Sequence, residues 1–187
     1  MEKAISNKPK ITSIFISYKA VKTLESFYAS FPKELVDEII LVDDASGDGT
    51  YELAQKLGIT SFENPVNLGY GGNMKRAIEI ALERGADIII DIHPDGEYKP
   101  SAIAPAIQKV RGGAGLVLGN RFTTLTAPLK SGMYSWKIIP IVVLNIFDRL
   151  ALGIKIHDLH QGFRVYTKTL LEQVNYTQNT NGYLFSF

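Results

Sequence analysis

The residues best suited to chemistry follow a strongly apolar run, Ile-Ile-Ile-Asp-Ile, that ends at residue 92. His93, Asp95 and Glu97 come next, at alternate positions around a Pro-Asp-Gly turn. In extended geometry alternate side chains point to the same side, so these three side chains can converge on one ligand. Carboxylates suit Mg²⁺, and a histidine nitrogen shifts the preference toward Mn²⁺ or a later transition metal. The alternative is a turn that carries an incidental histidine, because the turn itself needs only Pro, Asp and Gly.

A second candidate is the acidic pair Asp43 and Asp44 in "LVDDASGDGT", residues 41–50. Neighbouring side chains leave a strand on opposite sides. One carboxylate is therefore suited to accept from a nucleobase or ribose, while the other braces the loop. The alternative is structural: Ser46 or Asp48 caps the next helix and the two glycines form the turn. Capping alone leaves the acidic pair without a role.

A third candidate is the glycine-rich segment "NPVNLGYGGNMKRA", residues 64–77, which includes Gly69. Glycines before a helix let backbone N–H groups approach a phosphate at the positive end of the helix dipole. The segment is not a P-loop, because no Gly-Lys-Ser/Thr follows. It also departs from the dinucleotide pattern, because Met74 stands where a glycine is required. A flexible entry to a helix explains it equally well.

The last candidate is "IKIHDLHQGFRVY", residues 154–166, where polar side chains surround Gly162. Asp158 with a nearby histidine can act as a general base on an acceptor hydroxyl. Arg164 can bind a phosphate or form a structural salt bridge. These residues do not by themselves identify a reaction.

Short apolar runs alternate with helical patterns along the chain. The runs predict strands at 11–17, 38–44, 59–64, 86–92 and 115–120, and the patterns predict helices at 21–31, 48–58, 71–85 and 101–110. This alternation predicts an α/β fold with a mostly parallel central sheet flanked by helices. Ligands bind such sheets at the carboxyl ends of the strands. The acidic pair, the His93 cluster and Asn120–Arg121 each follow one of these strands.

Bulk composition narrows the functional classes. A chain of 187 residues, with 45% hydrophobic and 21% charged residues, fits one soluble domain. A net charge of +1 gives no reason to expect nucleic acid, and the absence of cysteine excludes disulfides and thiolate metal sites. The polar N-terminus lacks the apolar stretch of a signal peptide. The apolar segment 136–154 is interrupted by Pro140, Asn145 and Asp148, which predicts a half-buried or membrane-surface helix rather than a spanning one.

Taken together and in order, the motifs resemble family 2 glycosyltransferases of the GT-A fold, and most closely the dolichol-phosphate mannosyltransferase-like branch. The matching segments are "ISYKAVKTLESF", "VDDASGDGT", "NPVNLGYGGNMKRAI", "DIHPDGEYKP", "LGNRF" and "HDLHQGFRVYTKTLLEQV". They cover residues 11–175. The resemblance implies one Rossmann-like, nucleotide-sugar-binding GT-A domain over residues 1–187. Because the family usually continues beyond this point, we expect the domain to be truncated at its C-terminus.

The resemblance also implies a donor site with a divalent cation, Mg²⁺ or Mn²⁺. Asp95 takes the place of the principal metal-binding aspartate, Glu97 stands where a glutamine commonly assists, and His93 replaces the first aspartate of the family's Asp-x-Asp motif. The implied nucleotide-sugar site consists of Ser17, Tyr18, Asp43, Asp44, Gly69, Asp95 and Arg121. Within it, Ser17 and Tyr18 lie beside the base, and Arg121 lies near the donor phosphates.

On the acceptor side, the resemblance implies catalytic roles for Asp158, Arg121 and His160. Asp158 matches the aspartate of the Asp-x-x-Ser-Gly-Phe acceptor motif. His160 and Gln161 replace the usual small hydroxyl residues of that motif, which leaves the acceptor's identity open.

The implied reaction is inverting transfer of a sugar from a UDP- or GDP-linked donor to an acceptor. A polyprenyl phosphate is the preferred acceptor, because the apolar helix 136–152 can rest on a bilayer surface, where Lys130 and Lys137 can meet anionic groups. We expect a cytoplasmic protein at the cytoplasmic face of a membrane. The alternatives are transfer to a saccharide hydroxyl in glycan assembly, with Asp158 as base, or a catalytically silent module that binds nucleotide sugar. A nucleotidyltransferase is disfavoured, because no glycine follows the first strand.

Overall fold

The computed structural model of the protein describes residues 8–94, 100–122, 129, 135–156, 158–159 and 161–186. Three residues with predicted roles, Asp95, Glu97 and His160, lie outside the described residues. So does Lys130, one of the two lysines expected to meet anionic groups.

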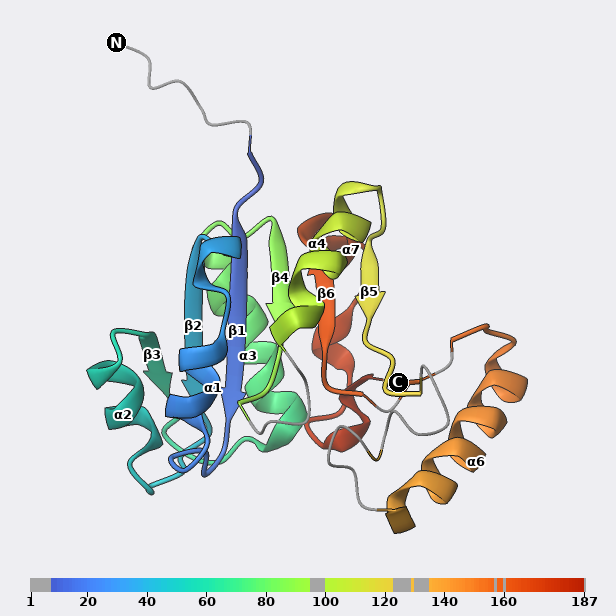
Figure 1. The fold of residues 1–187 in the computed structure, drawn as a ribbon, viewed down its shortest axis with the longest axis horizontal. Helices are drawn as coiled ribbons and strands as arrows, with labels where there is room; N and C mark the ends of the chain where they lie inside the picture. The colour runs from blue at the N-terminus through green and yellow to red at the C-terminus, as the bar shows by residue number, and fades with distance from the viewer. Residues whose placement is uncertain are drawn as a thin grey trace.

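A six-stranded sheet forms the centre of the molecule (Figure 1). Its strands are β1 (Ile11–Ser17), β2 (Glu38–Asp43), β3 (Thr60–Glu63), β4 (Ile88–Asp91), β5 (Leu116–Leu118) and β6 (Arg164–Thr167). Their order across the sheet is β3-β2-β1-β4-β6-β5. The first four strands in this order are parallel, whereas β6 runs antiparallel to both β4 and β5. The predicted α/β fold with a mostly parallel sheet is therefore confirmed.

The central strands are apolar because both faces of the sheet are covered. Every residue of β1 and of β4 is buried. Side chains alternate along β1, so Phe15 packs into the core on one face while Ile14 and Ile16 pack into the core on the other. A strand covered on both faces has a nearly continuous apolar sequence, as β4 does at residues 88–90.

The α-helices of the described residues form two layers over the sheet and one separate helix. They are α1 (Leu24–Ser30), α2 (Thr50–Lys56), α3 (Gly69–Glu83), α4 (Ile103–Arg111), α6 (Ser135–Leu152) and α7 (Lys168–Gln173), and short 3-10 helices lie at Lys33–Leu35, Pro100–Ala102, Tyr176–Gln178 and Tyr183–Ser186. Buried residues of α1, α2 and α4 share a core with one face, and those of α3 and α7 share a core with the other. Figure 1 shows α6 apart from both layers.

The predicted elements are confirmed, with small differences at their ends. The helix predicted at 21–31 begins at Leu24, because the N–H groups of Thr23 and Leu24 first form a turn on the carbonyl of Ala20. The helix predicted at 48–58 begins at Thr50, because Asp48 accepts hydrogen bonds from the amide and the hydroxyl of Thr50. In both cases a local turn takes the first donors that the helix would otherwise use.

The sheet brings the ends of its strands to one edge. The carboxyl ends of β1, β2, β4 and β5 lie at the bottom of Figure 1, where β6 begins. Ser17 is paired with Asp43 at the ends of β1 and β2, and Asp91 is paired with Arg164 where β4 ends and β6 begins. This carboxyl edge is where ligands bind in parallel α/β sheets. The loops that leave it carry the described candidate residues.

Candidate functional site

Asp43, at the end of β2, holds the loop that follows it. Its side chain is fully buried. Oδ2 accepts a hydrogen bond from the backbone N–H of Ser46 at 2.8 Å, and Oδ1 accepts from the Ser46 hydroxyl at 2.6 Å. The hydroxyl of Ser17, at the end of β1, donates to Oδ1 at 3.2 Å. Asp43 therefore ties the ends of two strands to one loop.

Asp44 points to the other side and holds a different loop. Its Oδ1 accepts from Nδ2 of Asn64 at 2.8 Å and from the N–H of Leu68 at 2.8 Å. Its Oδ2 accepts from the N–H of Gly69 at 3.0 Å. Both aspartates thus brace loops in the structure. Their contacts with a base and a ribose stay predictions.

Two residues in these loops have backbone conformations that L-amino acids rarely adopt. Lys19 follows β1 with a φ of 57°, and Ala45 follows β2 with a φ of 54°. Such conformations cost about 1–3 kcal/mol each. The hydroxyl of Ser46 stabilises the arrangement, because it accepts from the N–H of Lys19 at 2.7 Å while it donates to Asp43. Beside this turn the ring of Tyr18 is 53% exposed, which leaves it accessible to a ligand.

The C-terminal segment of the chain packs against the glycine-rich start of α3. The N–H of Gly71 donates to the carbonyl of Asn181 at 2.8 Å, and the N–H of Gly69 donates to Asp44. A Cβ atom at Gly71 would lie 2.8 Å from Cβ of Phe185. These glycines therefore let the C-terminal segment approach α3 closely. A contact between Gly69 and a nucleotide sugar stays a prediction.

A buried acidic and basic pair lies beside His93 at the end of β4. Asp91 is fully buried, and Arg164 is 6% exposed. Nη1 of Arg164 lies 3.9 Å from Oδ2 of Asp91 and donates to the Tyr70 hydroxyl at 2.9 Å. Nε2 of His93 lies 3.3 Å from Oδ1 of Asp91, and the His93 ring meets Tyr70 edge to face with 5.6 Å between centroids. His93 therefore lies within a charged cluster at the carboxyl edge.

In this cluster, burial and neighbouring groups shift the pKa of a side chain in opposite directions. Burial would lower the pKa of Arg164, but Tyr166, Tyr70 and Asp91 favour its charged form, so the pKa is raised. Burial raises the pKa of Tyr166, although Arg164 acts in the opposite direction. At neutral pH Arg164 is thus a permanent cation and Tyr166 is a neutral phenol.

Arg121 and Asp158 come from distant parts of the chain and form a bidentate pair. Nε of Arg121 donates to Oδ2 at 2.9 Å, and Nη2 donates to Oδ1 at 3.1 Å. The backbone N–H of Arg121 also donates to Oδ2 at 3.1 Å. The side chain of Asp158 is 0% exposed, and both its oxygens are engaged. The structure therefore brings these two predicted catalytic residues together as a hydrogen-bonded pair.

Helix α6 is joined to the loop that carries Asp158. Asn145 is 4% exposed, and its Oδ1 accepts from the N–H of Leu159 at 2.9 Å. A buried amide therefore holds α6 next to the predicted acceptor residues. Among the described residues, no helix is long and apolar enough to cross a membrane.

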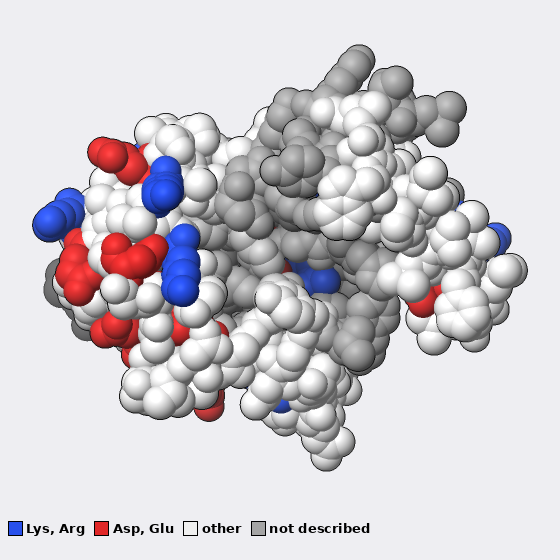
Figure 2. Space-filling view, turned by 90° about the horizontal axis from the view of Figure 1, so that it is seen from below, with Lys and Arg blue, Asp and Glu red and all other residues white. Residues whose placement is uncertain are grey.

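An apolar stripe runs along the exposed side of α6. Its members are between 59% and 79% exposed and recur every three or four residues: Trp136, Ile139, Val143, Phe147 and Leu150. Side chains at this spacing lie on one face of a helix. Figure 2 shows the carboxyl edge of the molecule, where charged side chains gather over the β1–β3 half and the surface around α6 is mostly uncharged. Exposed apolar patches of this kind mark contacts with proteins or membranes.

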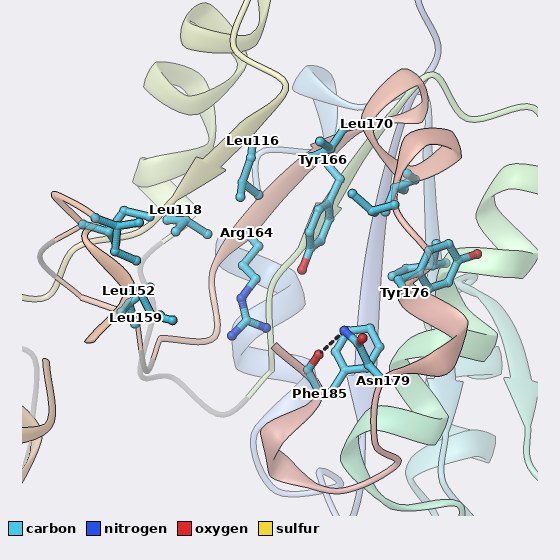
Figure 3. Close-up of a pocket in the computed structure, with 15 residues that line it drawn as sticks. Leu116, Leu118, Leu152, Leu159, Arg164, Tyr166, Leu170, Tyr176, Asn179 and Phe185 are labelled. Atoms are coloured by element: carbon cyan, nitrogen blue, oxygen red, sulfur yellow. Dashed lines mark hydrogen bonds between the residues drawn. The ribbon is translucent and has the colours of Figure 1, made fainter. Parts of the chain in front are cut away.

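An apolar cavity of about 420 Å³ lies between β5, β6, α7, the loop after α6 and the C-terminal segment. Arg164 and Tyr166 enter it from β6, and Nδ2 of Asn179 donates to the carbonyl of Phe185 at 2.7 Å on its border (Figure 3). The rest of the lining is mostly aliphatic and aromatic. Such a lining suits an apolar group rather than a nucleotide, because a base and a ribose need several polar partners.

The predicted metal site lies only partly within the described residues. His93 is described, and Asp95 and Glu97 are not. In the described part of the chain, no group of three His, Cys, Asp or Glu side chains is arranged to hold a metal ion. An imidazole and two carboxylates nevertheless fit the ligand preferences of Mn²⁺ or Mg²⁺. His93 also lies at the sheet edge where a donor diphosphate is expected.

Three polar residues at the centre of the site were not predicted from the sequence. Asn64 donates from Nδ2 to Oδ1 of Asn73 at 3.0 Å, and Asn73 donates to the carbonyl of Val42 at 3.0 Å. The third is Asp91, and the sequence did contain a signal for it. The polar residues at alternate positions, His93, Asp95 and Glu97, form a series that begins at Asp91. The two asparagines gave no local signal, because they meet only in the folded chain.

Comparison with known proteins places these features among sugar-transferring enzymes. The model of the family described as glycosyl transferase family 2 matches residues 14–174. A polyprenol monophosphomannose synthase of Mycolicibacterium smegmatis is 26% identical over 157 residues, which cover 79% of this chain and 57% of that protein. An undecaprenyl-phosphate mannosyltransferase of Micrococcus luteus is 27% identical over 147 residues, which cover 74% of this chain and 58% of that protein. The chain therefore spans less than two thirds of the length of these relatives.

Among solved structures, the fold is similar to that of glucosyl-3-phosphoglycerate synthase from Mycobacterium tuberculosis, crystallised with Mn²⁺, UDP and glucosyl-3-phosphoglycerate. The TM-score is 0.74 at 19% identity, over 95% of this chain and 62% of that one. At this identity the likeness shows a shared fold.

Replacing Arg121 with Met should lower the free energy of unfolding by about 3–5 kcal/mol, because Asp158 would stay buried without its cation. Urea denaturation followed by circular dichroism measures the loss. Adding Asp158→Leu should recover about 1–3 kcal/mol relative to the sum of the single losses. Arg84→Met is the control, since that side chain is 42% exposed and its salt bridge should contribute less than about 1 kcal/mol. Strictly additive losses would show that Arg121 and Asp158 do not stabilise one another.

Gly71→Ala should lower the free energy of unfolding by about 1–3 kcal/mol, despite the higher helix propensity of alanine, because its Cβ would collide with the C-terminal segment. Gly115→Ala is the matched control, because there a Cβ would meet its neighbours at 3.7 Å, an ordinary contact. The same urea experiment compares the two variants. Equal stability of the two would mean that close approach at Gly71 is not required.

Proposed function

Since the chain belongs to glycosyl transferase family 2 and has the GT-A fold, we propose that it transfers a sugar from a nucleoside-diphosphate sugar to a polyprenyl phosphate. The observation that carries the proposal is the junction of α6 with the acceptor loop. The apolar stripe of α6 is held by Asn145 beside Asp158 and Arg121, at the edge of the sheet where the donor would bind. The names of the two relatives, a polyprenol monophosphomannose synthase and an undecaprenyl-phosphate mannosyltransferase, support a lipid-phosphate acceptor.

The donor is proposed to lie across the ends of β1, β2 and β4. The exposed ring of Tyr18 can stack on a base, and the loops braced by Asp43 and Asp44 would surround the base and ribose. Arg121, near the donor phosphates by family resemblance, is held in place by Asp158. The presence of UDP in the similar solved structure supports a nucleotide at this edge, and the choice between UDP and GDP is left to experiment.

A divalent cation is proposed to assist departure of the diphosphate, as Mn²⁺ in the similar structure suggests. When bound, such an ion stabilises the negative charge that develops on the leaving diphosphate. His93, Asp95 and Glu97 are the residues that would hold it. His93 lies against Asp91 and Tyr70 at the edge of the sheet.

The proposed reaction needs no strong base. A phosphate oxygen of the lipid, already ionised, attacks the anomeric carbon, while the bond from that carbon to the diphosphate oxygen breaks and the nucleoside diphosphate keeps the electron pair. No proton has to be removed from the acceptor. This agrees with Asp158, whose two oxygens both accept hydrogen bonds from Arg121. A saccharide hydroxyl would need a base, so the paired state of Asp158 favours the lipid phosphate.

The expected place of action is a membrane surface. An amphipathic helix binds the boundary between headgroups and acyl chains when its apolar face can be buried there. The stripe of α6 gives the chain such a face next to the acceptor loop. The cytoplasmic side is proposed, because nucleoside-diphosphate sugars are expected there as donors.

One of the two nucleotides, UDP or GDP, should bind more tightly in the presence of a divalent cation, Mn²⁺ or Mg²⁺. Calorimetric titration with Mn²⁺, with Mg²⁺ and with chelator should show one nucleotide binding at least about tenfold more tightly with metal, or about 1.4 kcal/mol. Asp95→Asn should remove this enhancement because it removes a carboxylate ligand. Glu172→Gln is the control, an exposed carboxylate on α7, and should leave it unchanged.

The alternative result is that one nucleotide binds with the same affinity with and without metal, and equally to the wild-type protein and to Asp95→Asn. That result would favour a catalytically silent module that binds nucleotide sugar. No binding of either nucleotide by folded protein would contradict the donor site in this chain.

The protein should bind vesicles of phosphatidylcholine and phosphatidylglycerol through α6. The combined variant Ile139→Ser, Phe147→Ser and Leu150→Ser should weaken co-sedimentation at least about tenfold, because burying each of these side chains contributes about 1.5–3 kcal/mol. Val66→Ser with Val174→Ser is the control, since these side chains are 60% and 45% exposed on other elements. If the α6 variant and the control bind vesicles equally, α6 does not contact the membrane.

A further inference from the structure

Asp91 is a buried carboxylate whose position relative to His93 is unusual. It is the last residue of β4 and 0% exposed. Within the described residues, neither of its oxygens accepts a hydrogen bond of normal geometry. Nε2 of His93 nevertheless lies only 3.3 Å from Oδ1. Buried polar atoms without hydrogen bonds are rare and indicate either strain or a functional role.

The carboxylate of Asp91 also faces a cation. Arg164 is paired with Asp91 on the adjacent strand β6, and Nη1 of Arg164 lies 3.9 Å from Oδ2 of Asp91. Tyr70 accepts a hydrogen bond from the same nitrogen at 2.9 Å, which holds the guanidinium in place. A hydrogen on Nε2 of His93, facing the carboxylate, satisfies the contact.

The orientation of the ring is restricted from a second side. Tyr70 meets His93 edge to face, with an interplanar angle of 64°. The histidine ring is thus placed between a carboxylate and an aromatic ring. A small rotation of the ring would complete the hydrogen bond to Asp91 at the observed separation.

We propose that Asp91 is a positioning residue for His93. It accepts the hydrogen on Nε2, fixes the neutral tautomer with its lone pair on Nδ1, and so keeps His93 in the form that binds metals. Asp91 also keeps a negative charge next to the predicted metal motif, where His93 has replaced a carboxylate by a neutral ring. The proposed tautomer is argued from the 3.3 Å contact between Nε2 and Oδ1, and its use for a metal ion rests on the proposed function.

Nitrogen-15 NMR of the histidine side chains tests the tautomer without metal or substrate. The chain has three histidines, so loss of one set of signals in His93→Gln identifies His93. In the wild-type protein, the neutral form of His93 should carry its hydrogen on Nε2. A neutral ring with its hydrogen on Nδ1 would overturn the proposal. This spectrum needs no folded variant of Asp91.

Asp91→Asn should then abolish the preference for Nε2–H, because an amide no longer requires a donor. Asp87→Asn is the matched control: this residue lies just before β4 and accepts from the backbone N–H of Lys10 at 2.8 Å. In this control variant the nitrogen signals of His93 should be the same as in the wild-type protein. An unchanged tautomer in Asp91→Asn would mean that another group orients the ring.

Titration of Mn²⁺ in the presence of UDP and of GDP separates positioning from a purely structural role. Asp91→Asn should weaken Mn²⁺ binding about tenfold or more. In a His93→Gln background the same change should have almost no further effect. An equal loss in both backgrounds would show that Asp91 acts through Arg164 rather than through His93. Absence of Mn²⁺ binding in a wild-type protein with the expected tautomer would count against the proposed metal, and not against the positioning of His93.

Discussion

Among the described residues, four carboxylates are buried at the carboxyl edge of the sheet, and the loops around the candidate site are arranged to pair them. Asp43, Asp44, Asp91 and Asp158 are each no more than 3% exposed. A buried charge without partners is strongly unfavourable, so each carboxylate requires donors or a cation. The first two hold loops through hydroxyl and amide donors, and the last two face arginine guanidinium groups. The shape of the edge follows from these pairings.

This pairing also determines which chemistry the edge can support. Asp91 and Asp158 each face an arginine, and the two arginines place positive charge where an anionic donor is proposed to bind. An acceptor that is already ionised suits such an edge better than a hydroxyl does. The apolar stripe of α6 would bring that acceptor from a lipid surface, and the buried Asn145 keeps helix and edge together. The proposed membrane contact and the proposed phosphate recognition therefore meet at the hydrogen bond between Asn145 and Leu159.

Much of the site could be located from the sequence, because strands ending in polar residues must meet at one edge of a parallel sheet. The positions of Asp43, His93 and Arg121 at that edge follow from this rule. Their partners could not be located in the same way. The contact between Arg121 and Asp158 spans 37 residues, and the close packing of Gly71 against Asn181 spans more than a hundred. Such pairs depend on how distant loops pack, which no local pattern encodes.

The sequence by itself determined the α/β architecture, the order of its elements and the family, because apolar periodicity and short motifs act over neighbouring residues. Only the tertiary structure decided what the polar residues do. It made Asp43 and Asp44 braces of loops, filled the glycine-rich entry to α3 with the chain's own C-terminal segment, and placed Asp91 behind His93. The physical reason is that burial converts each charge into a requirement for a partner, and the partners come from other parts of the chain.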